Sequence, residues 1–289
     1  MRELATAIIL ALLFGELVSS GQAPGAGRPS NPLGDALVDI GGRRLHVTCT
    51  GAGSPTVIME AGLGASSRTW RAVQPVVAEV TRVCSYDRAG LGTSDPDPRT
   101  KTARRTSRSV VEDLRLLLRA AAITGPYVLV GHSLGGAHIR LFASRFPQDT
   151  VGMVLVDSSH EDQAARFSAT GYTPPAEPDP PAEQDPDRTD MLASLEEVGQ
   201  AHWRADIPLV VLSHGRKIAN TAPGITDEQA NRIEAAWLEL QRDLARRSSQ
   251  GRLVIAERSG HFVQNDEPAL VIEAIRDVVV AARRTASGR

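Results

Sequence analysis

The sequence is poor in groups that would bind polyanions. Lys101 and Lys217 are the only lysines, the arginines are scattered, and the formal net charge is -2. A near-neutral chain without a basic patch offers no electrostatic attraction for nucleic acid, so we expect no nucleic-acid partner. Long apolar runs are lacking as well. The run at residues 5–14 is too short to span a bilayer.

Signatures of bound cofactors are also missing from the sequence. No set of histidines, cysteines and carboxylates has the spacing of metal ligands. The glycine-rich stretch at residues 51–54 lacks the third glycine of a dinucleotide fingerprint and does not open a helix. We therefore predict neither a metal nor a cofactor. Cysteine is scarce too: Cys49 and Cys84 are buried thiols in a reducing compartment or, after export, candidates for a disulfide.

The N-terminus carries the features of an export signal. An arginine precedes the apolar run, and small residues follow it, which predicts a signal peptide at residues 1–23. Glu3 weakens the positive start of this segment, so an uncleaved anchor or a plain N-terminal helix stays an alternative. Residues 24–35, rich in glycine and proline, are interpreted as a linker. We expect a secreted or periplasmic protein without a stable membrane span once the signal is removed.

Residues 36–289 have the length and apolar content of one large globular domain. A hairpin over residues 38–49 comes first, and strand-like and helix-like segments then alternate from Pro55 onward. This alternation predicts a mostly parallel sheet with helices on both faces. The expected strands lie at 55–60, 82–86, 127–130, 153–156, 208–212 and 252–256, and the expected helices at 67–80, 110–121, 137–145, 225–247 and 268–282.

One segment breaks the alternation. Residues 158–206 include the proline-rich stretch 174–181, which cannot form regular helix or strand. Residues 191–203 look helical again. We interpret the whole insertion as a small lid between two sheet strands, and we expect it to set the choice of substrate.

A G-x-S-x-G pattern stands at the junction of a strand and a helix. Gly131-His-Ser133-Leu-Gly135 directly follows the apolar run that begins at Tyr127. A serine on such a sharp turn exposes its hydroxyl above the sheet edge, and flanking glycines leave room for the turn. On this motif and its context the chain resembles the α/β-hydrolase superfamily over about residues 36–280. The resemblance implies an eight-stranded sheet and assigns Ser133 as the nucleophile.

The resemblance also implies the nucleophile's partners. The family's histidine comes last, in the loop after the final strand, and His261 stands there. The family's usual place for the acid, after the second-last strand, holds no carboxylate. Some members place the acid one strand earlier, which favours Asp157. Asp227 and Glu228 remain the alternatives.

Two main-chain N–H groups should stabilise an oxyanion. By the resemblance they belong to Leu134, after the nucleophile, and to Leu63, in the loop after the third strand. Asp87 and Arg88 begin a stretch similar to the family's Asp-x-x-Gly-x-Gly-x-Ser, and we expect a structural contact between the two side chains. In the family's strand order the second and fourth strands are neighbours, which favours a disulfide between Cys49 and Cys84 in the exported protein.

The N-terminal signal and the resemblance together predict a secreted, cofactor-free serine hydrolase, specifically a carboxylesterase that acts on small or medium esters through an acyl-enzyme. An aminopeptidase or acyltransferase of the same fold, and a non-catalytic binding member, remain alternatives. A serine nucleophile argues against the dehalogenases and epoxide hydrolases of the superfamily, which use a carboxylate. The sequence identifies neither the substrate nor the oligomeric state.

Overall fold

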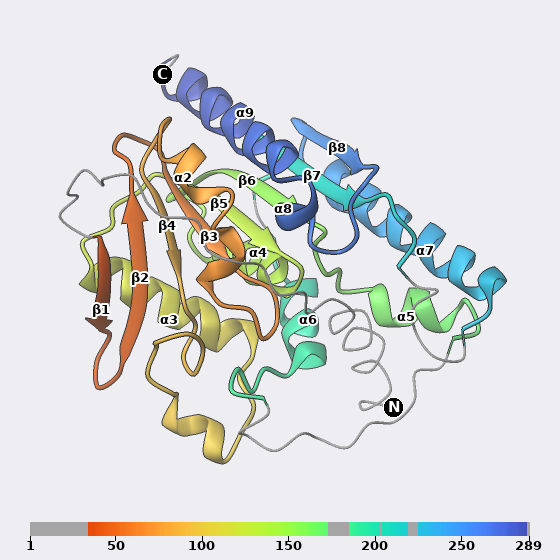
Figure 1. The fold of residues 1–289 in the computed structure, drawn as a ribbon, viewed down its shortest axis with the longest axis horizontal. Helices are drawn as coiled ribbons and strands as arrows, with labels where there is room; N and C mark the ends of the chain where they lie inside the picture. The colour runs from red at the N-terminus through yellow and green to blue at the C-terminus, as the bar shows by residue number, and fades with distance from the viewer. Residues whose placement is uncertain (1–33, 173–184, 203, 219–224, 288–289) are drawn as a thin grey trace.

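The structure, a computed structural model, describes residues 34–172, 185–202, 204–218 and 225–287. Within these ranges eight strands form one sheet in the order β1-β2-β4-β3-β5-β6-β7-β8, which Figure 1 shows from one edge to the other. β1 and β2 run antiparallel to their neighbours, and the others pair in parallel. The strands are β1 (Asp35–Asp39), β2 (Arg44–Thr50), β3 (Thr56–Glu60), β4 (Val83–Tyr86), β5 (Tyr127–His132), β6 (Thr150–Val156), β7 (Leu209–His214) and β8 (Gly251–Ala256). The predicted mostly parallel, eight-stranded sheet is confirmed.

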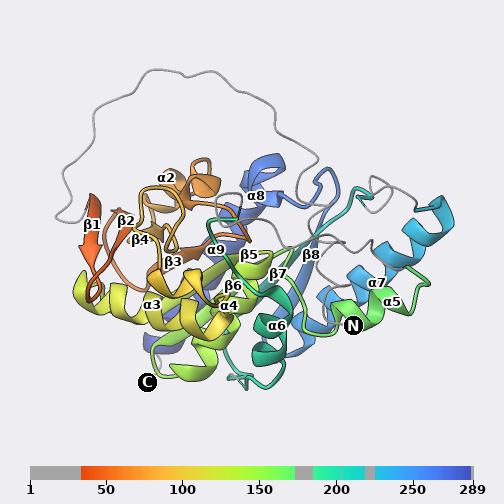
Figure 2. The same cartoon turned by 90° about the horizontal axis from the view of Figure 1, so that it is seen from below.

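Helices cover both faces of the sheet. They are η1 (Ser67–Trp70), α2 (Gln74–Val77), η2 (Pro98–Lys101), α3 (Ser107–Ala120), α4 (Leu134–Arg145), α5 (Gln163–Ser168), α6 (Met191–Gly199), α7 (Asp227–Arg246), α8 (Val263–Asp266) and α9 (Pro268–Ser287). Figure 2 shows α3, α4 and α6 on one side of the strands and α2 and α8 on the other. Side chains of β5 alternate between the two cores, with Leu129 in one and Val128 and Val130 in the other. No described helix is both long and apolar enough to cross a membrane.

The structure contains the disulfide that the strand order favoured. Cys49 of β2 lies directly opposite Cys84 of β4 in the antiparallel register, with the Cα atoms 4.1 Å apart. Both residues are buried. The bridge therefore joins two neighbouring strands inside the core.

The helix predicted over residues 67–80 is wrong as one continuous element. The structure has the short 3-10 helix η1, then a turn, then the single-turn helix α2. Pro75 is the second residue of α2 and has no N–H to donate to the carbonyl of Arg71. A continuous helix would need that bond, so the helix has to restart at the proline.

The inserted segment 158–206 divides into parts with different surroundings. α6 packs against α3 and α4, and its Met191, Leu195 and Val198 belong to the core on that side of the sheet. α5 packs instead on α7, where Phe167 contacts a small separate apolar cluster around Trp237. Residues 173–184 and 203 of the insertion lie outside the described residues, as do the expected signal peptide at 1–23 and most of the linker at 24–35. The lid therefore stays a prediction.

Candidate active site

Ser133 sits on a sharp turn between β5 and α4. Its backbone φ is 52° and its ψ is -125°, a left-handed conformation that non-glycine residues rarely adopt. A Cβ on Gly131 would lie 2.6 Å from the carbonyl oxygen of Gly135, and a Cβ on Gly135 would lie 2.4 Å from that of Ala61. Gly131 and Gly135 must therefore both lack a side chain for the turn to close.

The structure brings His261 and Asp157 together. Asp157 follows β6 and is fully buried, and His261 lies in the loop after β8. The distance from His261 Nδ1 to Asp157 Oδ2 is 2.7 Å. Asp227 and Glu228 are exposed on the first turn of α7, and Glu228 pairs there with an arginine of the same helix. Of the three candidate acids, Asp157 is the one that contacts His261.

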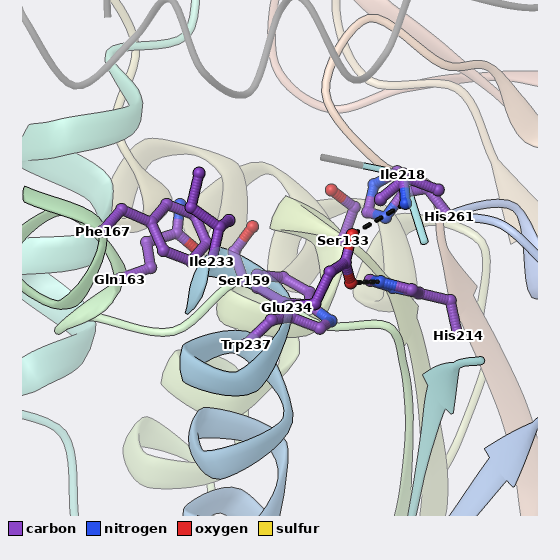
Figure 3. A pocket seen from close by; sticks show the side chains of 10 residues that line it. All are labelled: Ser133, Ser159, Gln163, Phe167, His214, Ile218, Ile233, Glu234, Trp237 and His261. Carbon is purple, nitrogen blue, oxygen red and sulfur yellow. Dashed lines mark hydrogen bonds and ion pairs between the residues drawn. The ribbon is translucent and has the colours of Figure 1, made fainter. Parts of the chain in front are cut away.

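Two polar side-chain atoms, Ser133 Oγ and His261 Nε2, are buried, and neither has a hydrogen-bond partner among the described residues. Because His261 Nδ1 faces a carboxylate, it carries the proton, and Nε2 of the neutral ring is free to accept one. Both residues line the same pocket, and Figure 3 shows them at one end of it. The arrangement offers a hydroxyl and a base to one bound molecule.

The pocket is largely apolar away from these two residues. It contains about 430 Å³ of space, including its opening to solvent. Its apolar side chains come from Phe167 of α5, Ile233 and Trp237 of α7, and Ile218. In Figure 3, Phe167 and Ile233 lie at the end opposite Ser133. The remaining lining residues are Ser159, Gln163, His214 and Glu234.

The two expected oxyanion donors lie beside the turn. Leu134 is the first residue of α4, so its N–H has no acceptor within the helix. Leu63 belongs to the segment 61–64 that follows β3, which we call the oxyanion loop. A Cβ on Gly62 of this loop would lie 3.2 Å from Ser133 Cβ and 2.9 Å from His132 Nδ1. The loop thus packs directly on the turn that carries Ser133.

The expected contact between Asp87 and Arg88 is not the one the structure makes. Asp87 accepts from the Ser67 N–H at 2.7 Å and faces His46 at 3.0 Å. Arg88 is 2% exposed and pairs with Glu60 instead, at 2.6 Å. Its buried side chain lies against the main chain of the oxyanion loop.

Arg88 also ties the oxyanion loop to the inserted segment. It donates to the carbonyl oxygens of Ala61 and Gly62 at 2.8 and 2.6 Å, and it pairs with buried Asp187 at 2.6 Å. Asp187 in turn accepts from the Gly64 N–H at 3.0 Å. Burial opposes the charge of Asp187, but the guanidinium outweighs it and holds the pKa of that carboxyl well below its usual range. Local sequence patterns carry no signal for this contact, because Asp187 lies 99 residues after Arg88 in the chain.

His132 supports the other side of His261. Its Nε2–H donates to the carbonyl oxygen of His261 at 3.0 Å, and the two rings lie 4.7 Å apart. Burial is the largest cause that lowers the pKa of His132, to about 3, with a smaller contribution from His261. His132 is therefore neutral at ordinary pH and adds no charge to the site.

Sequence reasoning missed a second histidine at the acid. His214, the last residue of β7, has its Nδ1 2.8 Å from Asp157 Oδ2. Trp237 of α7 donates its indole N–H to Asp157 Oδ1 at 2.8 Å. A signal for His214 was available, because it stands just after the second-last strand, where the resemblance places the acid. No group of described residues has the arrangement of a metal site.

Comparisons with known proteins agree with the fold. A family model described as the alpha/beta hydrolase fold matches residues 55–280. The uncharacterized protein YqjL of Bacillus subtilis is 31% identical over 82% of this chain and 88% of its own length. A malate-bound structure of a thermophilic esterase from Thermogutta terrifontis superposes with a TM-score of 0.58 at 20% identity, covering 86% of this chain and 98% of that one. A mutant epoxide hydrolase of Vigna radiata gives 0.60 at 13%, covering 86% and 98%. Proteins of different chemistry share the architecture, so the site residues have to decide the reaction.

Proposed function

The chain belongs to the α/β-hydrolase family, and from this premise we propose that it is a serine hydrolase, specifically a carboxylesterase that works through an acyl-enzyme. One observation carries the proposal. Ser133 Oγ and His261 Nε2 face one pocket without hydrogen-bond partners among the described residues, while His261 Nδ1 is bound to buried Asp157. A hydroxyl, a base and an orienting carboxylate in this order are the parts of nucleophilic acyl transfer.

The reaction follows from these positions. His261 Nε2 takes the proton of Ser133 as the serine oxygen attacks the ester carbonyl. The N–H groups of Leu63 and Leu134 stabilise the negative oxygen of the tetrahedral intermediate. His261 then gives the proton to the leaving alcohol, and the acyl group stays on Ser133. Water, deprotonated by the same nitrogen, releases the acid and restores the serine.

The pocket supports small or medium acyl groups. Its apolar end, formed by Phe167, Ile218, Ile233 and Trp237, suits an aliphatic or aromatic acyl chain. A space of about 430 Å³, part of it open to solvent, limits the length of that chain. We also propose that residues 158–206 act as a lid that sets the choice of substrate. Phe167 of α5 belongs to this insertion and lines the apolar end of the pocket.

The test is a panel of p-nitrophenyl esters of increasing chain length, with Ser133→Ala as the inactive variant. The matched control is Ser85→Ala, which removes an equally buried hydroxyl on β4, where it bonds Gln74. We expect hydrolysis by the parent and by Ser85→Ala, and loss of at least about a thousandfold in Ser133→Ala, as triad knockouts show. Activity of Ser133→Ala within tenfold of the parent would contradict the nucleophile.

Three other outcomes distinguish the alternative functions. Cleavage of amino-acid p-nitroanilides in preference to esters would indicate an aminopeptidase, and transfer of the acyl group to an added alcohol would indicate an acyltransferase. Folded protein that turns over none of these substrates would be a binding member of the fold.

We also propose that the protein is secreted or periplasmic. The buried disulfide between Cys49 and Cys84 supports an oxidising compartment, where such bonds persist. Expression of the full chain, followed by fractionation and N-terminal sequencing of the exported protein, tests export and the expected cleavage after residue 23. Retention in the cytosol with two free thiols would contradict both.

A further inference from the structure

Asp157 faces four donor groups from three parts of the chain: β7, α7 and the loop after β8. Oδ2 faces His261 Nδ1 at 2.7 Å and His214 Nδ1 at 2.8 Å. Oδ1 accepts from the Trp237 indole at 2.8 Å and from the His214 main-chain N–H at 3.1 Å. Asp157 itself has a φ of 45°, which turns its side chain toward these groups at the end of β6. The carboxylate is therefore shared between the base of the proposed triad and a second histidine.

Both ring nitrogens of His214 face carboxylates. Nδ1 lies against Asp157, and Nε2 lies 2.8 Å from Glu234 Oε2. An ionised carboxylate only accepts hydrogen bonds, so both nitrogens have to carry protons and the ring is an imidazolium. Burial disfavours this charge, but Asp157 and Glu234 outweigh it and raise the pKa of His214 to about 10. His214 thus stays cationic across the working range of an ordinary esterase.

Glu234 is fixed in turn by the wall of the pocket. Its Oε1 accepts from the Ile218 N–H at 2.7 Å, and its Oε2 meets His214. The dashed lines of Figure 3 mark both contacts. Glu234 and Trp237 lie one turn apart on α7, so a single helix supplies one partner for His214 and one for Asp157.

We propose that His214 and Glu234 are positioning residues that set how strongly Asp157 attracts a proton onto His261, and thereby the pH at which the enzyme becomes active. This inference rests on the proposed serine hydrolase function. The cation on His214 neutralises part of the charge of Asp157, so the carboxylate attracts a second proton onto the His261 ring less strongly than an unshielded carboxylate would. Glu234 holds that cation in place and offsets part of its effect.

Few charged or titratable groups face the two histidines within the described residues. His214 meets Asp157 at the end of β6 and Glu234 on α7, and His261 also packs against His132 of β5, which is neutral. Beyond His261, the Asp266 carboxylate accepts from the Gly260 N–H and pairs with Arg216, so the charges of that pair cancel. None of the variants changes the other neighbouring groups, so the variants differ from the parent at this site only in the charges of His214 and Glu234.

Charge counting gives each variant its own direction. His214→Asn keeps a neutral donor toward Asp157 and removes one positive charge, so the midpoint of the acid limb of kcat/KM should rise by about one pH unit. Glu234→Gln removes one negative charge, so the midpoint should fall. The double variant His214→Asn with Glu234→Gln restores the parent's net charge, and its midpoint should return to near the parent's value. The control is Glu228→Gln, on the exposed first turn of the same helix, which should leave the midpoint unchanged.

The experiment is the pH profile of kcat/KM for a p-nitrophenyl ester, measured for all five proteins with thermal unfolding as the check on folding. A merely structural role predicts losses of kcat without this order of midpoints. Equal midpoints in all variants, or shifts of both single variants in the same direction, would overturn the proposal. Glu234→Gln alone still tests the sign if the His214 variants do not fold.

A second readout does not need turnover. In ¹⁵N-histidine-labelled parent protein, the His214 ring is identified as the signal that disappears in His214→Asn, and it should keep the shift of an imidazolium up to about pH 9. The titration midpoint of the His261 ring should be highest in His214→Asn and lowest in Glu234→Gln, with the parent and the double variant in between. If no ester is hydrolysed but the ring titrations follow this order, the proposed function fails and the coupling stands. If esters are hydrolysed and the His214 signal titrates near pH 6.5, the coupling fails alone.

Discussion

Replacing Asp157 by asparagine is expected to abolish most activity through the tautomer of His261. An amide has one accepting oxygen, whereas the carboxylate has two. The Oδ1 side receives the Trp237 indole and the His214 main-chain N–H, at 2.8 and 3.1 Å, so the amide oxygen should take that side. The amide NH₂ then faces His261 Nδ1, which has to give up its proton and accept. The proton moves to Nε2, the nitrogen that should receive the proton of Ser133.

The expected loss is large. In a serine protease the same substitution lowers kcat by about 10⁴-fold for the same tautomeric reason. Stability should fall as well, because cationic His214 loses one of its two buried carboxylate partners; breaking such a pair costs on the order of 3–5 kcal/mol. Urea unfolding measures the second effect, and kcat for a p-nitrophenyl ester at the pH plateau measures the first.

Asp227→Asn is the matched control, since it makes the same chemical change on the exposed first turn of α7. It should retain the parent's kcat. A kcat of Asp157→Asn within tenfold of the parent, or a comparable loss in Asp227→Asn, would refute the assignment of the acid. A folded Asp157→Asn protein with unchanged KM and strongly reduced kcat is the expected result.

Further outcomes follow from other contacts. Reducing the Cys49–Cys84 bridge should lower the free energy of unfolding by about 4 kcal/mol, the chain-entropy value for its 35-residue separation, and a loss below about 1 kcal/mol in urea unfolding with dithiothreitol would contradict this. The pKa of His214, about 10 in the folded chain against an ordinary 6.5, makes its stabilisation complete below pH 6.5 and lost as pH approaches 10; unfolding free energy should fall by up to about 1.4 kcal/mol per pH unit between these limits, and this slope should be absent in His214→Asn. Asp187→Asn should loosen the oxyanion loop and reduce kcat about tenfold or more with little change in KM; an unchanged kcat would show that the Asp187 contacts with Arg88 and Gly64 do not position this loop. Phe167→Ala should move the preferred ester toward longer acyl chains, and an identical preference profile would show that α5 does not limit the pocket.

Local patterns carried most of what could be predicted from the sequence. The glycines around Ser133 indicate a strained turn by themselves, because only a close approach of backbones requires them at both positions. The resemblance singled out His261 and Asp157 by their order in the chain, since each follows a strand that the apolar pattern makes visible, and the structure brings the two side chains into contact. The fold, which the structure confirms, could be predicted in the same way, because alternating strands and helices leave few topologies for a parallel sheet.

Contacts between distant segments could not be predicted in this way. Arg88 selects Glu60 and Asp187 rather than its chain neighbour, and this choice depends on where the inserted segment returns to the sheet. His214 meets Glu234 only because α7 is rotated to put that side chain toward β7. Spacing along the chain holds no information on such rotations. Pairwise register and helix orientation, which only the folded chain defines, decide them.

The central claim is that Ser133 is the activated nucleophile of this protein, and covalent labelling tests it most directly. Incubation with a fluorophosphonate, followed by peptide mass spectrometry, should find one adduct per chain, on Ser133. Labelling carried out at low pH, or on heat-unfolded protein, should give no adduct. Ser133→Ala should stay unlabelled, while Ser85→Ala should label like the parent. Folded parent protein that takes up no label, or that carries the adduct on a different residue, would contradict the account.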